Sequence, residues 1–154
     1  MSQNTQGIKL QYAVESTKGT KPTGAFTTLP GITEIPEISS APDTLEDTTL
    51  DNEEYKTYID GLKDTGGTLA FTANDTPEFR TAIKTLMSAF ESAKGDGKAV
   101  WFRILVPDPI GEQMDFTGKP QPLGFGGASI NSVLTTTFNV VVTGEPSWST
   151  AAGE

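Results

Sequence analysis

The stretch TLAFTANDTPEFRTAIKTLMSAFESAKG, residues 68–95, contains both kinds of secondary structure predicted for this chain. Residues 68–74 alternate between apolar and polar side chains, a period of two that indicates a strand. After residue 78 the apolar side chains recur at steps of three and four, which places them on one face of a helix. The members of this face are Phe79, Ala82, Ile83, Leu86, Met87, Phe90 and Ala93. The stretch therefore predicts a strand followed by an amphipathic helix that packs on a sheet.

The ends of this helix are also marked in the sequence. Thr76 or Asp75 can accept hydrogen bonds from the first free amides, and Pro77 suits the first helical turn because its missing N–H is not needed there. Lys94 followed by glycine is typical of a helix end. We therefore predict a helix over residues 76–94.

Three further segments alternate in the manner of strands: residues 7–15, 98–106 and 129–143, the last as one long strand or a pair. Shorter extended pieces at 26–32 and 33–39 contain proline, which cannot donate to a sheet ladder, so we expect edge strands or irregular structure there. Residues 107–127 form a passage rich in glycine and proline, to which the sequence assigns no element. Residues 146–154 are expected to form a flexible tail. Together these patterns predict a mainly β, α+β fold with one flanking helix.

Three residues outside the expected core are candidates for contacts with other subunits. Val100, Phe102 and Ile104 occupy one face of the 98–106 strand, and Trp101 and Arg103 occupy the other. That second face either packs within the chain or contacts a neighbour. Trp148 lies in the expected tail, where it is either unanchored or an anchor for a partner, because Trp contributes strongly to interfaces.

The length and composition limit the classes of function. With 154 residues the chain is predicted to form a single domain, residues 1–154, with a core at about 7–145. It contains no cysteine and no histidine, which excludes Ser-His-Asp and Cys-His catalysis, disulfides and His-ligated zinc. We expect no cofactor and no metal. The first residues do not resemble a signal peptide, and no apolar run is long enough for a membrane span, so we expect a soluble protein made in the cytoplasm.

The negative charge is concentrated in one segment. Ten of the 20 acidic residues fall within residues 34–64, where only Lys56 and Lys63 oppose them, so this segment carries −8 of the net charge of −9. Such a chain is unsuited to gripping phosphates, which requires cationic side chains. The segment also contains Leu50, Tyr55 and Tyr58, which a purely solvated linker would not need.

Catalysis or metal binding explains the acidic segment less well than a solvated loop or a contact with another protein. Residues 43–54 contain clustered carboxylates that could serve in acid–base catalysis, but we favour a solvated or partner-facing loop by roughly ten to one. The same residues contain no glycine, which a calcium-binding loop of the EF-hand type needs for its turn. GFGGAS at 124–129 precedes a strand-like run instead of a helix, so we expect a turn and not a phosphate site.

Residues 32–75, ITEIPEISSAPDTLEDTTLDNEEYKTYIDGLKDTGGTLAFTAND, resemble the major tail tube proteins of phages with flexible, non-contractile tails. The family pattern has an Ile-Pro-containing strand, an alternating run before a TTL, a Tyr-Ile-x-Gly-Leu-Lys-Asp strand and an LxFTxN strand. Here these correspond to residues 34–36, 45–50, 58–64 and 69–74. The resemblance covers about residues 7–145, and outside 34–75 it lies in the order of the elements.

The resemblance implies a β-sandwich or barrel-like tail tube fold whose subunits form hexameric rings that stack into a tube. It implies that residues 40–57 are a long extended loop that contacts neighbouring subunits and rings, followed by a strand at 58–63 that returns to the sheet. The contact residues expected on this basis are Leu45, Glu46, Asp47, Leu50, Asp51, Glu53, Glu54, Tyr55 and Tyr58.

The implied function is structural and not enzymatic. The expected partners are copies of the same chain, a tape measure protein, a tail terminator and distal tail proteins. DNA would pass through the lumen without specific binding, no membrane would be involved, and the protein would be found in the virion tail after assembly in the host cytoplasm. Two alternatives stay open: a tube protein of a related tailocin or secretion system, and a β-sandwich module that binds carbohydrate or another ligand.

Overall fold

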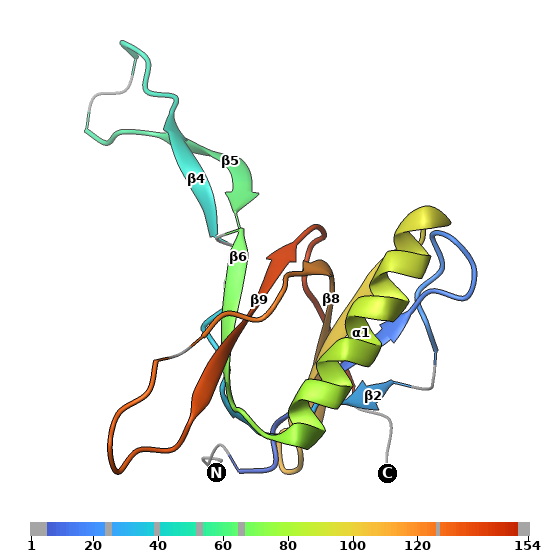
Figure 1. Cartoon of the computed structure of the whole chain (residues 1–154). Helices are drawn as coiled ribbons and strands as arrows, with labels where there is room; N and C mark the ends of the chain where they lie inside the picture. Colours follow the sequence, from blue (N-terminus) through green and yellow to red (C-terminus); the bar gives the residue numbers. More distant parts are fainter. Residues whose placement is uncertain are drawn as a thin grey trace.

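The computed structural model describes residues 6–23, 26–38, 41–51, 54–64, 67–125 and 127–150, with only the backbone described at 41–43 and 61–64. Its main sheet has eight strands, seven of them in the order β2-β1-β7-β8-β9-β6-β3, with β10 also paired to β8 (Figure 1). Their bounds are β1 Lys9–Val14, β2 Thr27–Thr28, β3 Ile32–Glu34, β6 Thr68–Asn74, β7 Val100–Leu105, β8 Glu112–Pro120, β9 Thr135–Val142 and β10 Ser147–Thr150. The strand pairings that the structure defines are antiparallel. The predicted mainly β fold class is confirmed.

β8 and β9 overlap only at their C-terminal ends, so the ladder between them is short. Residues 118–120 of β8 pair with 140–142 of β9, and beyond the end of β8 the backbone N–H groups of Gln121 and Gly124 donate to the carbonyls of Asn139 and Thr137. β6 pairs with 135–141 on the other edge of β9, and β10 pairs with residues 112–115 of β8. The result is a half-barrel whose two sides face each other across the core.

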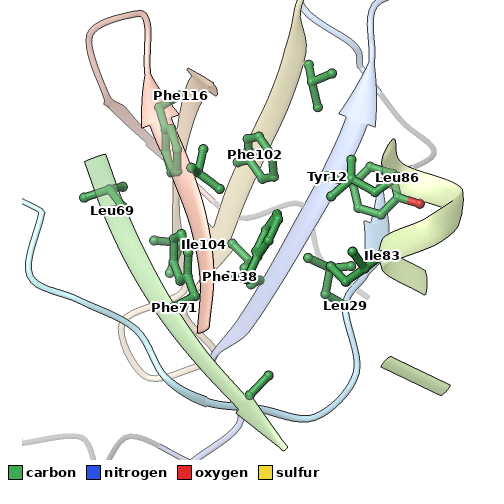
Figure 2. Packing of buried hydrophobic residues seen from close by; sticks show 14 of the residues in the cluster. Tyr12, Leu29, Leu69, Phe71, Ile83, Leu86, Phe102, Ile104, Phe116 and Phe138 are labelled. Atoms are coloured by element: carbon green, nitrogen blue, oxygen red, sulfur yellow. The ribbon is translucent and has the colours of Figure 1, made fainter. Parts of the chain in front are cut away.

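Phenylalanine side chains fill the space between these two sides (Figure 2). Phe102 on β7 stacks on Phe116 of β8 with ring centroids 5.7 Å apart. Phe138 on β9 lies 6.4 Å from Phe102 although β7 and β9 are not hydrogen-bonded neighbours. On its other side Phe138 contacts Phe71 of β6, also at 6.4 Å. These rings join the two sides of the curl into one core.

The helix α1 spans Pro77–Gly95 and agrees with the helix predicted over residues 76–94. The hydroxyl oxygen of Thr76 accepts a hydrogen bond from the backbone N–H of Phe79 at 3.2 Å, which caps the first turn. Ile83 and Leu86 pack into the same cluster as Leu29 and Tyr12 (Figure 2). The helix thus covers one side of the core with the apolar face that the sequence predicted. Among the described residues, no helix has the length and apolar character needed to cross a membrane.

The predicted strands at 7–15, 68–74, 98–106 and 129–143 are confirmed as β1, β6, β7 and β9. The proline-containing pieces at 26–32 and 33–39 supply β2 and β3, which are the two ends of the strand order, as expected for edge strands. On β7, side chains alternate between buried and half-buried positions, which confirms the assignment of its two faces.

Two segments to which the sequence assigned no strand contain one. β8 lies within the passage 107–127, and β10 occupies residues 147–150 of the expected flexible tail, for which that prediction was wrong. Gly118 and Pro120 are residue types that are rare inside strands, so the sequence of β8 did not indicate one. The glycine is nevertheless required there, because a Cβ at residue 118 would lie 2.5 Å from the Cγ1 of Val140. β10 was missed because its pairing partner is distant in sequence and its own side chains are exposed.

The acidic segment also differs from its prediction. Residues Ala41–Glu46 form β4, which pairs with β5 at Tyr58–Asp64 in a separate two-stranded sheet. The expected extended loop is therefore half of a hairpin, and the strand at 58–63 does not return to the main sheet. Pro42 obscured β4 in the sequence, and the register shifts between Pro42 and Thr44. A proline is tolerated in this strand because β4 has only one neighbour.

Replacing Gly118 with alanine is expected to lower the free energy of unfolding by about 1–3 kcal/mol, because the added methyl group overlaps Val140 in the ladder between β8 and β9. Urea denaturation measures this change. Gly95→Ala is the matched control: a Cβ there meets no atom within 4 Å, and alanine is the better helix former, so stability should be equal or higher. Equal stability of the two variants would contradict the close approach of β8 and β9.

Candidate assembly interface

The β4–β5 hairpin projects from the sheet on the side away from α1 (Figure 1). Leu45 pairs with Ile59 and Glu46 with Tyr58 across the two strands. Beyond the strands, the backbone N–H of Asp47 donates to the carbonyl of Thr57 at 2.7 Å. The Thr57 hydroxyl donates to the carbonyl of Asp47 at 2.7 Å, which closes the base of the tip. Thr57, Tyr58 and Ile59 are residue types enriched in strands, which favours pairing on this side of the hairpin.

Large apolar side chains of the hairpin are exposed to solvent. Leu50 at the tip is fully exposed and Tyr55 is 80% exposed. Leu45, Tyr58 and Ile59 are each more than half exposed. An isolated two-stranded hairpin is marginally stable in water, and a cluster of exposed apolar side chains is typical of surfaces that bind proteins, membranes or ligands or that aggregate. The hairpin therefore has the properties of an interface element.

Carboxylates surround these apolar side chains. Glu46, Asp47, Asp51 and Glu54 are exposed, and Glu53 lies outside the described residues. Lys56 approaches Glu46 at 4.0 Å, a distance at which an exposed pair contributes little to stability. The structure thus brings most of the predicted contact residues together on one projecting element. Their contact with another subunit stays a prediction.

Trp101 and Arg103 lie on the face of β7 opposite the core and have partners within the chain. The indole N–H of Trp101 donates to Oε1 of Glu15 at 2.9 Å. The guanidinium of Arg103 donates through Nε to Oδ1 of Asp115 at 2.7 Å and lies 3.7 Å from the ring of Phe26. These contacts support the packed-face alternative, and a further contact of either residue with a neighbour stays a prediction.

A buried carboxylate organises this second face. The side chain of Asp115 is fully buried between the cations of Arg103 and Lys21. Lys21 also lies over the Trp101 ring, 5.6 Å from its centroid. The two cations offset part of the cost of burying the Asp115 carboxylate, and removing one of them would leave a buried charge poorly compensated. The cluster fixes the segment before β2 against β7 and β8.

Sequence reasoning missed two exposed apolar surfaces. Ile59 was assigned to a strand of the main sheet, and Phe125, Ile130 and Val133 lie exposed in the connection between β8 and β9. Residues 121–134 contain no charged side chain, which was the available signal. In Figure 1 this orange connection and the hairpin extend from opposite ends of the β6–β9 pair.

Trp148 lies on β10, opposite Met114 of β8, and is 57% exposed. Its backbone is therefore paired in the sheet, in contrast to the predicted flexible tail. Within the described ranges, no group of three or more histidine, cysteine or acidic residues is arranged to hold a metal ion.

A family described as phage tail tube, TTP, lambda-like, matches residues 1–102, which is about two thirds of the chain. The chain belongs to this family. The resemblance seen in residues 32–75 is thereby confirmed, and a tail tube protein is a structural component of the virion. No match was found among the curated proteins.

Solved structures of tail-like particles share the fold. The chain superposes on a subunit of the tail of an empty GTA particle, refined with helical C6 symmetry, with a TM-score of 0.61 at 15% identity. The match covers 96% of this chain and 99% of that chain. A subunit of the six-fold symmetrised baseplate of the anti-feeding prophage gives a TM-score of 0.61 at 10% identity, covering 97% and 98%. A chain from the virion of a native gene transfer agent gives 0.58 at 14%, covering 96% and 99%.

Glu15 supplies a test of the second face of this tail tube protein. Burial raises the pKa of the Glu15 carboxyl, but hydrogen bonds from Trp101, Gly19 and Ala99 more than offset this, so its pKa lies below the ordinary value of 4.5. Because the folded-state pKa is depressed, the stabilisation is present above about pH 4.5 and is lost as the pH falls through the folded-state pKa.

Glu15→Gln is therefore expected to lower the free energy of unfolding by about 1–3 kcal/mol at pH 7. The difference from the unmodified protein should shrink as the pH falls below the ordinary value, as measured by urea denaturation across pH 3–7. Glu91→Gln, at an exposed position on α1, is the control and should change little. A difference that is constant with pH would contradict the assigned role of the charge.

Proposed function

We propose that this protein is the subunit of a phage tail tube and that it assembles into stacked hexameric rings that conduct DNA into the host. Family membership provides the tail tube role. Hexameric stacking is supported by the shared fold with a GTA tail refined with C6 helical symmetry. The single observation that carries the assembly role is the projecting hairpin. Its apolar side chains are exposed, because the core of the same chain does not cover them.

The contacts that close a ring would involve the sheet edges. β2 and β3 end the strand order, with two and three residues respectively, and within the described residues no further strand pairs with the outer side of either. An exposed edge is a template for pairing with another chain, and a ring satisfies every edge with an identical neighbour. The hairpin, including Leu50, Tyr55 and the carboxylates around them, would supply contacts between rings. Trp148 on the outer strand β10 would contact a neighbour within the same assembly.

The acidity of the chain fits a conduit that DNA traverses without binding. The net charge is −9, and like charges repel the phosphate backbone. The proposed partners in the virion are further copies of the chain, the tape measure protein, the tail terminator and distal tail proteins. Assembly would take place in the host cytoplasm, and no catalytic step is assigned to the protein.

A tube from a related phage-like particle is the second candidate. The shared fold with a subunit of the anti-feeding prophage baseplate favours it, because the same architecture occurs in a particle with another name and role. The two candidates differ in cargo and agree on ring assembly. Nuclease-protected DNA in purified particles that contain this chain would favour the phage tail.

Assembly is tested by electron microscopy of the purified protein at increasing concentration. Tubes with a regular axial repeat are expected, and replacing both Leu50 and Tyr55 with aspartate should abolish them by placing charge in the dry contact. The circular dichroism of the subunit should not change, because both side chains are exposed. Thr81→Asp adds the same kind of charge at an exposed position on α1, outside every surface proposed to take part in assembly, and should leave the tubes unchanged. If the double variant forms unaltered tubes, the hairpin is not part of the assembly interface.

A further inference from the structure

A cavity of about 620 Å³ opens between the C-terminal half of α1 and the ends of β8 and β9. Its apolar lining includes Met87, Phe90, Val100 and Pro120. Met87 and Phe90 are only partly buried, so part of the apolar face of the helix is left uncovered by its own chain. A cavity of this size accommodates one or two large side chains.

Lysines surround this apolar lining. Lys94 comes from the last turn of α1, Lys98 from the turn after it and Lys119 from β8, whereas Glu91 is the single acid in the lining. Within the described part of the chain, none of the three lysines has an ion-pair partner. In a chain with 20 acidic and 11 basic residues, this is a local surplus of positive charge. An occupant of the cavity would therefore be apolar at its centre and acidic around it.

The tip of the β4–β5 hairpin has this composition. Leu50 and Tyr55 are its most exposed apolar side chains, and Asp47, Asp51 and Glu54 are exposed around them. Over residues 41–64 the chain has eight acids and two lysines, a net charge of −6. Complementary charge steers two surfaces together and selects their register, while apolar side chains in a dry centre supply the affinity.

The hairpin of the same chain is not placed to fill the cavity. In Figure 1 the hairpin extends away from α1, on the other side of the sheet. A second copy offers the same hairpin to the cavity of the first, which is a heterologous contact that can propagate along a ring or a tube.

We propose that the cavity beside the C-terminal half of α1 receives the hairpin tip of a second copy of this chain. Leu50 and Tyr55 enter the apolar lining, and the carboxylates of the tip pair with Lys94, Lys98 and Lys119. The proposal rests on the proposed assembly, since its occupant is another subunit, and it adds the surface that receives the hairpin.

Disulfide crosslinking tests the contact directly, because the chain contains no cysteine of its own. A copy with Leu50→Cys is mixed with a size-tagged copy carrying Gln121→Cys at the rim of the cavity. Under assembly conditions a mixed crosslinked dimer is expected on a non-reducing gel. Thr81→Cys, exposed near the other end of α1, is the control receptor and should give no crosslink.

Two results overturn the proposal. One is the absence of the Leu50→Cys to Gln121→Cys crosslink in preparations whose micrographs contain tubes, which leaves the proposed function intact. The other is a crosslink of Leu50→Cys to Ile130→Cys in place of Gln121→Cys, which would assign the hairpin to the uncharged connection between β8 and β9. If the unmodified protein forms no tubes at all, the proposed function fails first, and this proposal fails with it.

Charge reversal gives an independent readout. Lys94→Glu with Lys119→Glu should raise the concentration needed for half-maximal assembly by about tenfold or more, since like charges then face each other. Asp51→Lys with Glu54→Lys on the hairpin should restore assembly in the same chain. Lys84→Glu, an equal charge change on α1 outside the cavity, should have little effect. Failure of the hairpin reversal to rescue assembly, with the subunit folded by circular dichroism, would contradict the pairing.

Discussion

The contact between Phe102 on β7 and Phe138 on β9 is the interaction on which the rest of this structure depends. The two strands are not paired, and their rings meet across the interior of the half-barrel. Aromatic side chains bury large apolar areas, so this contact holds the two sides of the half-barrel together. The pairing of β8 with β9 requires Gly118, where β8 and the side chain of Val140 approach too closely for a Cβ.

The curl decides which parts of the chain remain outside the core. β6 pairs with β9 and β3, and the hairpin that precedes β6 extends beyond the sheet, where no strand of the main sheet pairs with it. The connection between β8 and β9 extends from the other end of the same pair (Figure 1). Leu123 of this connection still packs against the core, whereas Phe125, Ile130 and Val133 and the apolar side chains of the hairpin are exposed. The closure of the core therefore decides which apolar side chains are left for the proposed assembly contacts.

Charge and apolar surface are distributed in opposite ways on the two sides of the molecule. The hairpin combines exposed apolar side chains with carboxylates, whereas the cavity beside α1 combines an apolar lining with lysines. Carboxylates keep the free hairpin in solution and hinder association of two hairpins, because like charges face each other. This arrangement favours contact between different surfaces of two copies over contact between equal ones.

The sequence by itself determined the elements whose patterns are local. Alternation in residues 68–74 and 98–106 and the apolar stripe of residues 79–93 led to β6, β7 and α1, because a single buried face imposes a period on the chain. The family resemblance within residues 32–75 was likewise carried by short motifs, and the role in contacts that it implies for the acidic segment stays a prediction. Glu53 lies outside the residues that the structure describes.

Only the tertiary structure decided the features that depend on distant partners. β8 became a strand because it pairs with β7, β9 and β10, and β10 became one because it pairs with β8. Gly118 and Pro120 in β8 and the exposed side chains of β10 gave neither segment a strand pattern in the sequence. β4 and β5 paired with each other instead of with the main sheet, and the lysines that surround the cavity come from α1, the turn after it and β8. A pattern along the chain reports which face of an element is buried, whereas the identity of its neighbour is set by how the sheet curls and closes its core.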